Sequence, residues 1–309
     1  MTASPRTPRI AIFTDEPGWH GRVLSEAFAA AGCEASYVSL KDCRIDVDGA
    51  RPTVVIPGFE DGLPAGALVR GVAGGTLEEV VLRLDVLHVL PVLGVPIVNS
   101  GRAIERTVDK AMTSFLLAHA GIPTPRTWVA ESRTAAVEVA ARELAAGRTL
   151  VLKPLFGSQG DGIARLTNLD ELEAAAPPTG VWYLQEFVER GAGDYRDWRV
   201  LVVQGSARAA MERVSEHWVT NRAQGARCEP TRLEPELARL AEAAAAAVDI
   251  DYTGVDLMRD RDGRWWVGEV NGIPAWQGLQ RVTEVDIAPL LAGALLARMG
   301  TAAEARGQR

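Results

Sequence analysis

The sequence has few of the residues that mark a disulfide-bonded or zinc-binding protein. Its 309 residues include three cysteines, an odd number with no Cys-x-x-Cys pair. They also include four histidines, no two of which stand at the spacing of a zinc site. These shortages argue against a disulfide framework and against a histidine-based metal site. They predict reduced thiols in a cytoplasmic protein.

Long apolar runs and an excess of basic charge are also absent. No window reaches the roughly 18 uninterrupted apolar residues that a membrane helix needs, and the apolar run near the N-terminus is too short for a signal peptide. Lysine and arginine number 33 against 40 aspartate and glutamate, a formal net charge of −7, with both signs interspersed. We therefore expect no membrane or nucleic-acid partner, and a small-molecule or protein substrate is favoured.

The patterns that are present predict a chain of the α/β class with α+β lobes. At 47% hydrophobic and 24% charged residues, 309 residues can form two or three packed units. Residues 1–98 alternate apolar runs with helical periods, as in an open α/β domain. Residues 99–184 predict a helix followed by a small α+β lobe. Residues 185–300 predict antiparallel strands, an alanine-rich helix and a hairpin, and residues 301–309 a polar tail.

The stretch "WWVGEVNGIPAW", residues 265–276, places an acid and an amide two positions apart on a predicted strand. Side chains alternate faces along a strand, so Glu269 and Asn271 project the same way, toward Asp256 on the preceding strand of the hairpin. Two carboxylates and one amide oxygen suit Mg²⁺, which prefers oxygen ligands and shares phosphate oxygens. Taken in isolation, the pattern is better explained by surface charges at Asp256 and Glu269 and a turn residue at Asn271, so the context of the other motifs decides.

The stretch "VLKPLFGSQGDGI", residues 151–163, ends an apolar strand with Lys153 and continues into a glycine-rich turn. Gly157, Gly160 and Gly162 would give a flexible, amide-rich loop able to close over phosphates. The loop has neither the P-loop order nor the dinucleotide-binding order of glycines. A plain hairpin turn is the alternative.

Two further segments carry polar groups at predicted element ends. Lys110 begins a helix with one apolar face, where a lysine is by itself simply solvated. The run "YLQEFVE", residues 183–189, has the character of a hinge in which a flat adenine could lie.

These pieces, in this order, resemble the ATP-grasp superfamily, in particular RimK-type ligases that join an amine, often that of glutamate, to a carboxylate. The resemblance spans about residues 97–290. It rests on "VDKAMTSFLLAHAGIPTP", "VLKPLFGSQGDGI", "LQEFVE", "RDWRVLVV", "GVDLM" and "EVNGIPAWQGLQRVTEVDIA". It implies an ATP-grasp fold preceded by an N-terminal open α/β pre-ATP-grasp domain, with ATP and Mg²⁺ as cofactors.

The resemblance also implies roles for individual residues. The nucleotide would be held by Lys110, Lys153, Gly157, Ser158, Gln159, Gly160, Gly162, Gln185, Glu186, Phe187, Val188, Asp197 and Asn221. Within this set the lysines would contact phosphates, the glycine loop would cover them, residues 185–188 would border adenine, and Asp197 would lie near the ribose. Asp256, Glu269 and Asn271 would hold two Mg²⁺ ions, for which Mn²⁺ could substitute. Arg199 and Arg213 would face the reacting phosphate or the acid substrate.

The implied chemistry is the formation of an acyl phosphate, which an amine then attacks to give an amide. The chain most resembles ligases of tetrahydromethanopterin-type coenzymes, so the expected product is a glutamylated one-carbon coenzyme of the tetrahydromethanopterin or methanofuran kind. Alternatives are glutamylation of a protein C-terminus or of an amino-carrier protein, a kinase on the same scaffold, and a non-catalytic nucleotide-binding module. Many members of the family form dimers or tetramers, so a homo-oligomer is also open.

Two segments depart from the RimK pattern and bear on the substrate. Val219 and Ala223 stand in a run where RimK-type enzymes usually have basic residues, although Arg222 remains between them. Trp276, with its neighbour Ile273, replaces a commoner run of small residues. We expect these two side chains to form a flat apolar wall beside the metal site, suited to a pterin-like body. Packing of Trp276 in a core is the alternative.

Overall fold

The computed structural model describes residues 7–48, 51–157, 160–175, 177, 180–191, 193–220 and 225–307. The chain divides into two compact units. Unit 1 comprises Met1–Ile104, Ile250–Tyr252 and Ile273–Arg309, and unit 2 comprises Glu105–Asp249 and Thr253–Gly272. Helix α3 (Gly101–Val108) and strand β14 (Tyr252–Arg259) each contribute residues to both units.

Unit 1 is built on a four-stranded parallel sheet with the order β2-β1-β5-β6. The strands are β1 (Arg9–Phe13), β2 (Glu34–Val38), β5 (Gly66–Val69) and β6 (Ile97–Val98). The helices are α1 (Gly18–Ala30), α2 (Leu77–Val92), α8 (Gln277–Gln280), α9 (Ile287–Gly307) and the short η1 (Leu40–Asp42). A separate hairpin joins β3 (Arg44–Asp46) to β4 (Thr53–Val55).

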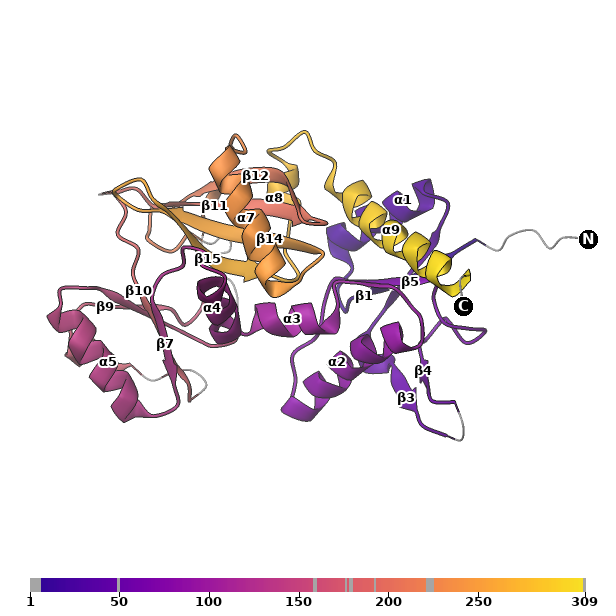
Figure 1. Cartoon of the computed structure of the whole chain (residues 1–309), viewed down its shortest axis with the longest axis horizontal. Coiled ribbons are helices and arrows are strands. Elements are labelled where there is room, and N and C mark those ends of the chain that lie inside the picture. The colour runs from indigo at the N-terminus through magenta and orange to yellow at the C-terminus, as the bar shows by residue number, and fades with distance from the viewer. Residues whose placement is uncertain are drawn as a thin grey trace, which may run out of the picture. The chain divides into compact units, whose positions relative to one another are not determined.

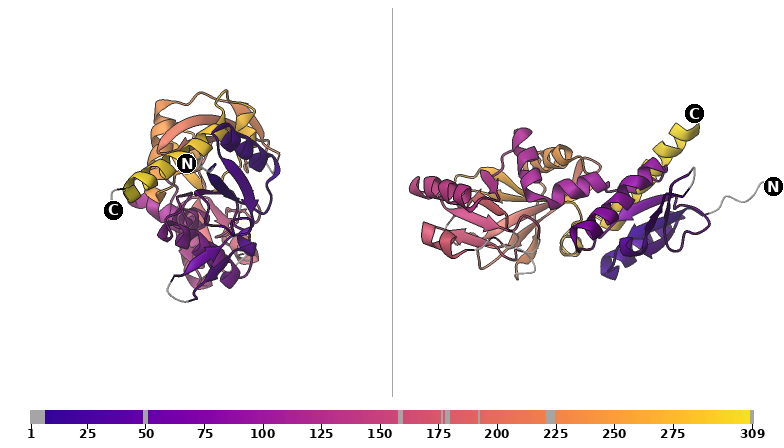
Figure 2. Two further views of the ribbon diagram at one scale, coloured as in Figure 1. Left: turned by 90° about the vertical axis from the view of Figure 1, so that its right-hand side faces the viewer. Right: turned by 90° about the horizontal axis from the view of Figure 1, so that it is seen from below.

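The helices of unit 1 cover both faces of its sheet. Figures 1 and 2 show the C-terminal helix α9, in yellow, beside α1, and Figure 1 shows α2 on the other side of the sheet. Helix α2 begins with a complete capping box, in which Thr76 and Glu79 each accept the other's backbone N–H. The strands β1 and β5 are buried almost throughout because both faces are covered, which explains their continuous apolar sequences.

Unit 2 contains two sheets. The smaller is antiparallel with the order β7-β10-β8-β9, from β7 (Thr127–Ala130), β8 (Leu150–Lys153), β9 (Ala164–Leu166) and β10 (Trp182–Glu186). The larger has the order β13-β12-β11-β14-β15, from β11 (Arg196–Val203), β12 (Ser206–Val214), β13 (Arg227–Pro230), β14 and β15 (Trp265–Asn271). Its helices are α4 (Lys110–His119), α5 (Arg133–Ala145), α6 (Leu169–Ala174) and α7 (Pro235–Val248).

Local sequence sets where the functional elements of unit 2 begin and end. Asp109 caps α4 by accepting from the backbone N–H groups of Ala111 and Met112, which makes Lys110 the first helical residue. The chain leaves this helix through Gly121, whose φ of 71° favours glycine. The alanine run of α7 packs on β11, β12 and β15, because small side chains let a helix approach a sheet closely.

Several sequence expectations differ from the structure. No strand is predicted from the sequence at Gly66–Val69, which forms the inner strand β5, because four residues are too few to show a strand period. The frayed tail expected at residues 301–309 is wrong as far as Gly307, because α9 continues to that residue. Residues 273–300 were assigned by sequence to a C-terminal lobe, whereas they pack with unit 1, and the boundary at residue 184 falls inside β10.

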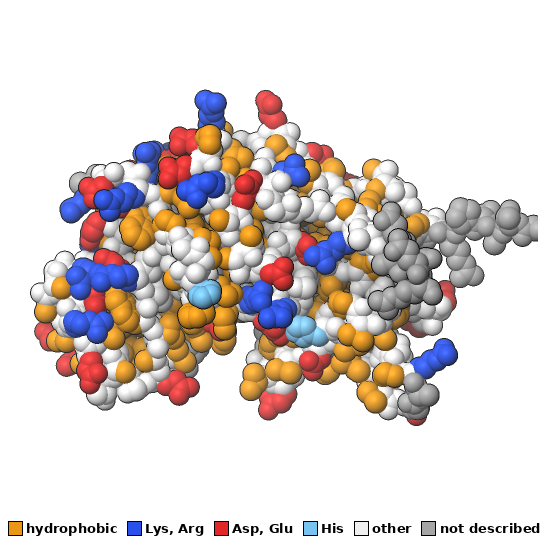
Figure 3. Space-filling view, in the orientation of Figure 1, with side chains coloured by type: hydrophobic (Ala, Val, Ile, Leu, Met, Phe, Trp, Pro, Cys, Tyr) orange, Lys and Arg blue, Asp and Glu red, His pale blue; other side chains and the backbone are white. Residues whose placement is uncertain are grey.

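Charge is distributed without a dominant sign on the face that Figure 3 shows, where acidic and basic side chains of the described residues lie interspersed. No helix within the described part of the chain is long and apolar enough to cross a membrane. The three cysteines are free thiols.

Candidate active site

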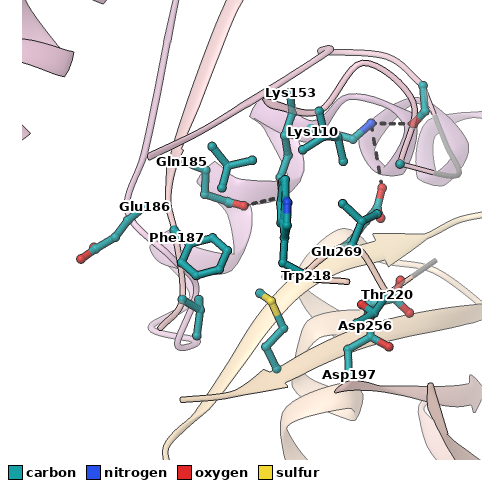
Figure 4. A pocket seen from close by; sticks show the side chains of 18 of the residues that line it. Lys110, Lys153, Gln185, Glu186, Phe187, Asp197, Trp218, Thr220, Asp256 and Glu269 are labelled. Atoms are coloured by element: carbon teal, nitrogen blue, oxygen red, sulfur yellow. Dashed lines mark hydrogen bonds and ion pairs between the residues drawn. The ribbon is translucent and has the colours of Figure 1, made fainter. Parts of the chain in front are cut away.

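A pocket in unit 2 brings together side chains from both of its sheets and from α4 (Figure 4). Of the residues predicted from sequence, twelve line it: Lys110, Lys153, Gly157, Gly160, Gln185, Glu186, Phe187, Val188, Asp197, Arg213, Asp256 and Glu269. Gly162, Arg199 and Asn271 are not among the residues that line the pocket. Ser158, Gln159 and Asn221 lie outside the described residues.

The two lysines enter the pocket from the end of β8 and from the start of α4. Lys153 donates from Nζ to Oε1 of Gln185 at 2.6 Å. Lys110 donates to the backbone oxygen of Gly157 at 2.6 Å, and its Nζ lies 3.9 Å from Oε1 of Glu269. Burial lowers the pKa of both lysines, and the negative charge of Glu269 only partly offsets this effect. Both ammonium groups are therefore short of nearby anions, a deficit that phosphate oxygens would fill.

The carboxylates of the larger sheet, unlike the lysines, have nearby groups of opposite charge. Asp256 on β14 accepts two hydrogen bonds from Arg199, both at 2.6 Å, and its Oδ2 lies 2.9 Å from Nη2 of Arg213. Burial alone would raise the pKa of Asp256, but the two guanidinium groups outweigh it and lower the pKa to about 2. Asp256 is therefore ionised at neutral pH.

Asp197 forms the second carboxylate of this network. It accepts two hydrogen bonds from Arg213 and one from Thr220, each at 2.6 Å. Burial nevertheless raises the pKa of Asp197, and the charge of Asp256 acts in the same direction. Arg213 is thus shared between two buried carboxylates, which hold its pKa above the ordinary value against the effect of burial.

The hairpin of β14 and β15 gathers the three oxygen-bearing groups predicted as metal ligands. Asp256 is paired with Glu269 across the two strands, and a register shift follows Asp256. Nδ2 of Asn271 lies 3.4 Å from Oδ2 of Asp256 and donates to the oxygen of Gly254 at 3.0 Å. No group of three or more His, Cys, Asp or Glu residues that could hold a metal ion forms among the described residues, and this hairpin offers two carboxylates with an amide as the third group. Two carboxylates and one amide fit Mg²⁺ that keeps water and phosphate ligands.

The other end of the pocket is apolar and aromatic. Phe187 meets Trp218 edge to face with ring centroids 5.8 Å apart, and the guanidinium of Arg165 lies 4.3 Å from the centre of the Phe187 ring. Met258 and Val151 also line this part. The side chain of Glu186 points away from the cavity (Figure 4). Its Oε2 accepts a hydrogen bond from Nε of Arg126 at 2.8 Å.

Sequence reasoning missed several lining residues, among them Arg190, Trp218, Thr220 and Met258. Trp218 and Thr220 lie in residues 215–220, which have no regular period in the sequence, and hydrogen bonds of the folded chain hold this segment at the pocket. Arg190 donates to the backbone oxygen of Trp218 at 2.7 Å. The presence of a tryptophan in a polar loop was the one available signal.

Trp276 does not form the predicted wall beside the metal site. Its side chain is 1% exposed and packs edge to face on Trp19 and His20, with ring centroids 4.8 and 4.9 Å away. Ile273 packs against the apolar core of unit 1. The prediction of an open apolar wall is therefore wrong, because the chain after Asn271 turns these side chains into a core.

Two sheets facing one pocket with lysines on one side and carboxylates on the other define a nucleotide-dependent ligase of the ATP-grasp class. Comparison with known proteins agrees: the RimK-like ATP-grasp domain matches residues 107–295. The chain belongs to this family. Membership makes it an ATP-grasp ligase and implies the use of ATP with Mg²⁺.

Named relatives include a tetrahydromethanopterin:α-L-glutamate ligase of Methanococcus maripaludis, 40% identical over 228 residues that cover 72% of this chain and 75% of the relative. The α-aminoadipate–LysW ligase LysX of Saccharolobus solfataricus is 31% identical over 64% of this chain and 74% of its own. Among solved structures, a RimK domain ATP-grasp protein from Sphaerobacter thermophilus has a TM-score of 0.69 at 25% identity, covering 93% and 99% of the two chains. The ATP-grasp ligase PsnB, solved with a minimal precursor, has a TM-score of 0.71 at 23% identity, covering 94% and 99%, and supports the fold.

Proposed function

We propose that the protein adds L-glutamate, through an amide bond, to a carboxyl group of a small coenzyme of one-carbon metabolism, of the tetrahydromethanopterin or methanofuran kind. The observation that carries the proposal is the 40% identity to a tetrahydromethanopterin:α-L-glutamate ligase. The pocket supports ligase chemistry because it retains Lys110, Lys153, Asp256 and Glu269 together.

The proposed division of labour follows the electrostatics of the pocket. Lys110 and Lys153 would bind nucleotide phosphates, since each is a partly buried cation whose pKa is lowered because nearby anions do not fully offset its burial. The loop 157–162 would cover the phosphates, and residues 185–188 would border adenine. Asp197 would lie near the ribose, with Asn221 nearby.

Metal would be held by Asp256, Glu269 and Asn271, as two Mg²⁺ ions for which Mn²⁺ can substitute. Bound there, the metal would neutralise charge on the phosphates during transfer. Arg199 and Arg213 would face the reacting phosphate or the acid substrate. Their present bonds to Asp256 mean that a metal ligand and two arginines are already held in one network.

The reaction that this arrangement supports needs no nucleophilic side chain. A carboxylate oxygen of the acid substrate attacks the γ-phosphorus of ATP, so ADP leaves and an acyl phosphate forms. The amine of glutamate then attacks the acyl carbon, and phosphate leaves as the amide bond forms. The protein's part is to neutralise converging anions and to exclude water, which would hydrolyse the acyl phosphate.

A second candidate is glutamylation, or a related ligation, on an amino-carrier protein. We propose the cytoplasm as the compartment for both candidates. The name of the relative LysX states that it ligates α-aminoadipate and LysW. Similarity to LysX therefore favours a carrier protein over a protein C-terminus as the alternative substrate. A carrier protein and a coenzyme present the same reacting groups, so the two candidates share the pocket chemistry described above.

The test is a matrix of acids and amines scored by ADP release and by product mass. The protein is incubated with ATP, Mg²⁺ and L-glutamate together with a tetrahydromethanopterin-type acid, a methanofuran-type acid, or a carrier protein ending in glutamate. We expect ADP release that depends on both substrates and a product heavier by one glutamyl residue for a coenzyme. Addition to the carrier alone would replace the first candidate by the second. A stable phosphorylated product without an amide would contradict both.

A further inference from the structure

The parallel sheet of unit 1 has a topological feature that the nucleotide pocket does not use. In the order β2-β1-β5-β6, the chain runs from β1 through α1 to the edge strand β2. It runs from β5 through α2 to the opposite edge strand β6. Open α/β sheets bind ligands at the carboxyl ends of the strands where such connections diverge. In this chain those ends are followed by Thr14 after β1 and by Arg70 after β5.

Arg70 is held at this position with part of its hydrogen-bonding capacity unused. Its Nη1 donates to the backbone oxygen of Pro274 at 2.9 Å. Its Nε is buried and has no acceptor among the described residues. Within the described chain no carboxylate forms an ion pair with this guanidinium, whereas many other arginines have one. Arg70 is therefore a half-buried cation that still lacks an anion.

A second orphaned donor lies on the same loop, two residues after Pro274. Nε1 of Trp276 is buried and has no acceptor in the described chain. The loop itself is fixed, because Nε2 of His20 accepts from the backbone N–H groups of Trp276 and Gln277 at 3.2 and 3.3 Å. A buried donor without a partner destabilises the fold, because it has lost its hydrogen bond to water. The segment 274–277 is thus connected to two buried N–H groups without acceptors, that of Arg70 through its hydrogen bond to Pro274 and that of Trp276 itself.

The first turn of α1 supplies further donors at the same end of the sheet. The helix begins after Pro17, no side chain caps it, and no acidic residue stands in its first turn. Its 13 residues give the N-terminus a partial positive charge. Trp19 and His20 occupy this turn and pack on Trp276, which joins the helix end to the orphaned donors. The nearby carboxylate of Asp15 is already engaged by Ser39 at 2.7 Å and Lys41 at 3.4 Å.

We propose that Arg70, Nε1 of Trp276 and the first turn of α1 form a recognition site in unit 1 for the carboxylate of a small acid substrate, which rests on the ligase function proposed above. A carboxylate offers two acceptor oxygens in a plane, which matches a guanidinium and a neighbouring N–H. The rings of Trp19 and His20 are half-buried and supply an apolar border for the body of that acid. Because solvent reaches neither orphaned nitrogen, the proposal requires that an entering carboxylate displace part of the loop 273–277 that His20 otherwise anchors.

The site takes either the acid acceptor or L-glutamate, since both carry carboxylates. The test is equilibrium binding without ATP, followed by tryptophan fluorescence, with L-glutamate, with a tetrahydromethanopterin-type acid and with inorganic phosphate as separate probes. Trp276→Phe keeps an aromatic ring and deletes only the donor. Arg70→Met removes the charge, Arg70→Lys keeps it, and Arg22→Met on the outer surface of α1 is the matched control.

We expect Arg70→Met to raise the Kd of one of the two acids at least tenfold, and Trp276→Phe and Arg70→Lys to raise the same Kd less. Arg22→Met should leave the Kd unchanged, and the KM for ATP should be unchanged in all four variants. An unaltered Kd in Arg70→Met overturns the proposal. Binding of inorganic phosphate with the same affinity as the carboxylic acids also overturns it. If Arg70→Met fails to fold, as thermal unfolding would show, Arg70→Lys and Trp276→Phe decide by the same criteria.

Failure of the ligase proposal gives a different result. In that case no acid supports ADP release or amide formation in the wild-type protein. Binding of an acid in the absence of ATP, sensitive to Arg70 and not to Arg22, still supports the site.

Discussion

The two sheets of unit 2 present opposite charges to one pocket, and they stabilise those charges to different degrees. The smaller sheet contributes Lys153, a buried ammonium whose hydrogen-bond partner is the neutral Gln185. The larger sheet contributes Asp197 and Asp256, each held by a guanidinium in paired hydrogen bonds. A buried unpaired cation is costly, whereas a bidentate pair offsets much of its own desolvation.

The difference indicates what each side of the pocket is prepared to receive. The lysine side has a deficit of negative charge that only a ligand can supply, so nucleotide phosphates should both bind there and stabilise the fold. The carboxylate side is already neutralised, so a metal ion must compete with Arg199 for Asp256. Affinity for nucleotide should therefore depend on the lysines, and turnover on the carboxylates.

The largest effect is expected on the carboxylate side. Asp256→Asn should lower turnover about 10²–10³-fold, because an uncharged amide loses the ion pair with Arg199 and the anion proposed for the metal. ADP release at saturating ATP and substrates measures this loss. Asp262→Asn, in the exposed turn of the same hairpin, is the control and should retain turnover. Near-native turnover in Asp256→Asn would remove the functional contrast between the sheets.

The next effect concerns affinity on the lysine side. Lys153→Met should raise the KM for ATP about ten- to a hundredfold, since a charge-assisted hydrogen bond is worth about 1.5–3 kcal/mol. The same variant should raise the Tm of the nucleotide-free protein, because a buried cation with a lowered pKa is removed. Lys41→Met, an exposed lysine of unit 1, should change neither quantity. A lower Tm in nucleotide-free Lys153→Met would show that the ammonium is already well compensated.

A smaller effect of the same kind should appear as a dependence of stability on pH. Because burial lowers the pKa of Lys153 and Lys110 in the folded state, the unfolded chain binds more protons between those values and about 10.4, the ordinary pKa. The free energy of unfolding contributed by these groups should therefore rise with pH across that interval. Urea unfolding between pH 7 and pH 10 measures the slope. The double variant Lys110→Met with Lys153→Met should have a shallower slope than the wild-type protein, and an equal slope would contradict the assignment.

Several of the motif residues could be predicted from sequence because they stand at the end of a regular element or alternate along one strand. Lys153 ends an apolar strand, and Glu269 and Asn271 alternate on a strand opposite Asp256. Strand periodicity fixes which side chains share a face, so the convergence of these three side chains followed from local rules, whereas their role as metal ligands remains a proposal. The ion pairs that Arg199 and Arg213 make with particular carboxylates depend on the order of β11, β12 and β14 in the sheet, which no local pattern encodes.

The errors have a common physical origin in long-range packing. Trp276 follows Asn271 by five residues, so sequence distance suggested a place beside the metal. The chain instead enters unit 1 after Gly272, and the tryptophan is buried against Trp19, more than 250 positions earlier in the sequence. A large aromatic side chain packs wherever the most apolar surface is buried, and that surface cannot be located from neighbouring residues alone.

The smallest effect is expected at the aromatic end of the pocket, where neither lysines nor carboxylates act. Trp218→Leu removes the aromatic ring that meets Phe187, but it leaves the backbone oxygen of residue 218 bonded to Arg190. The loop should therefore keep its position, while the end of the pocket that we propose for adenine loses one aromatic face. An aromatic contact is worth about 0.5–1.5 kcal/mol, so the KM for ATP should rise about two- to tenfold with little change in kcat.

The change in KM can be checked by steady-state ADP release, with Trp266→Leu as the matched control. Trp266 lies on β15 in the same unit and is not among the residues that line this pocket. A fall in kcat of similar size to that in Asp256→Asn would mean that Trp218 acts on the reacting groups and not on the base. An unchanged KM would mean that the charged side chains bind the nucleotide without a contribution from Trp218. Nucleotide affinity would then depend on the charged groups of the two sheets alone.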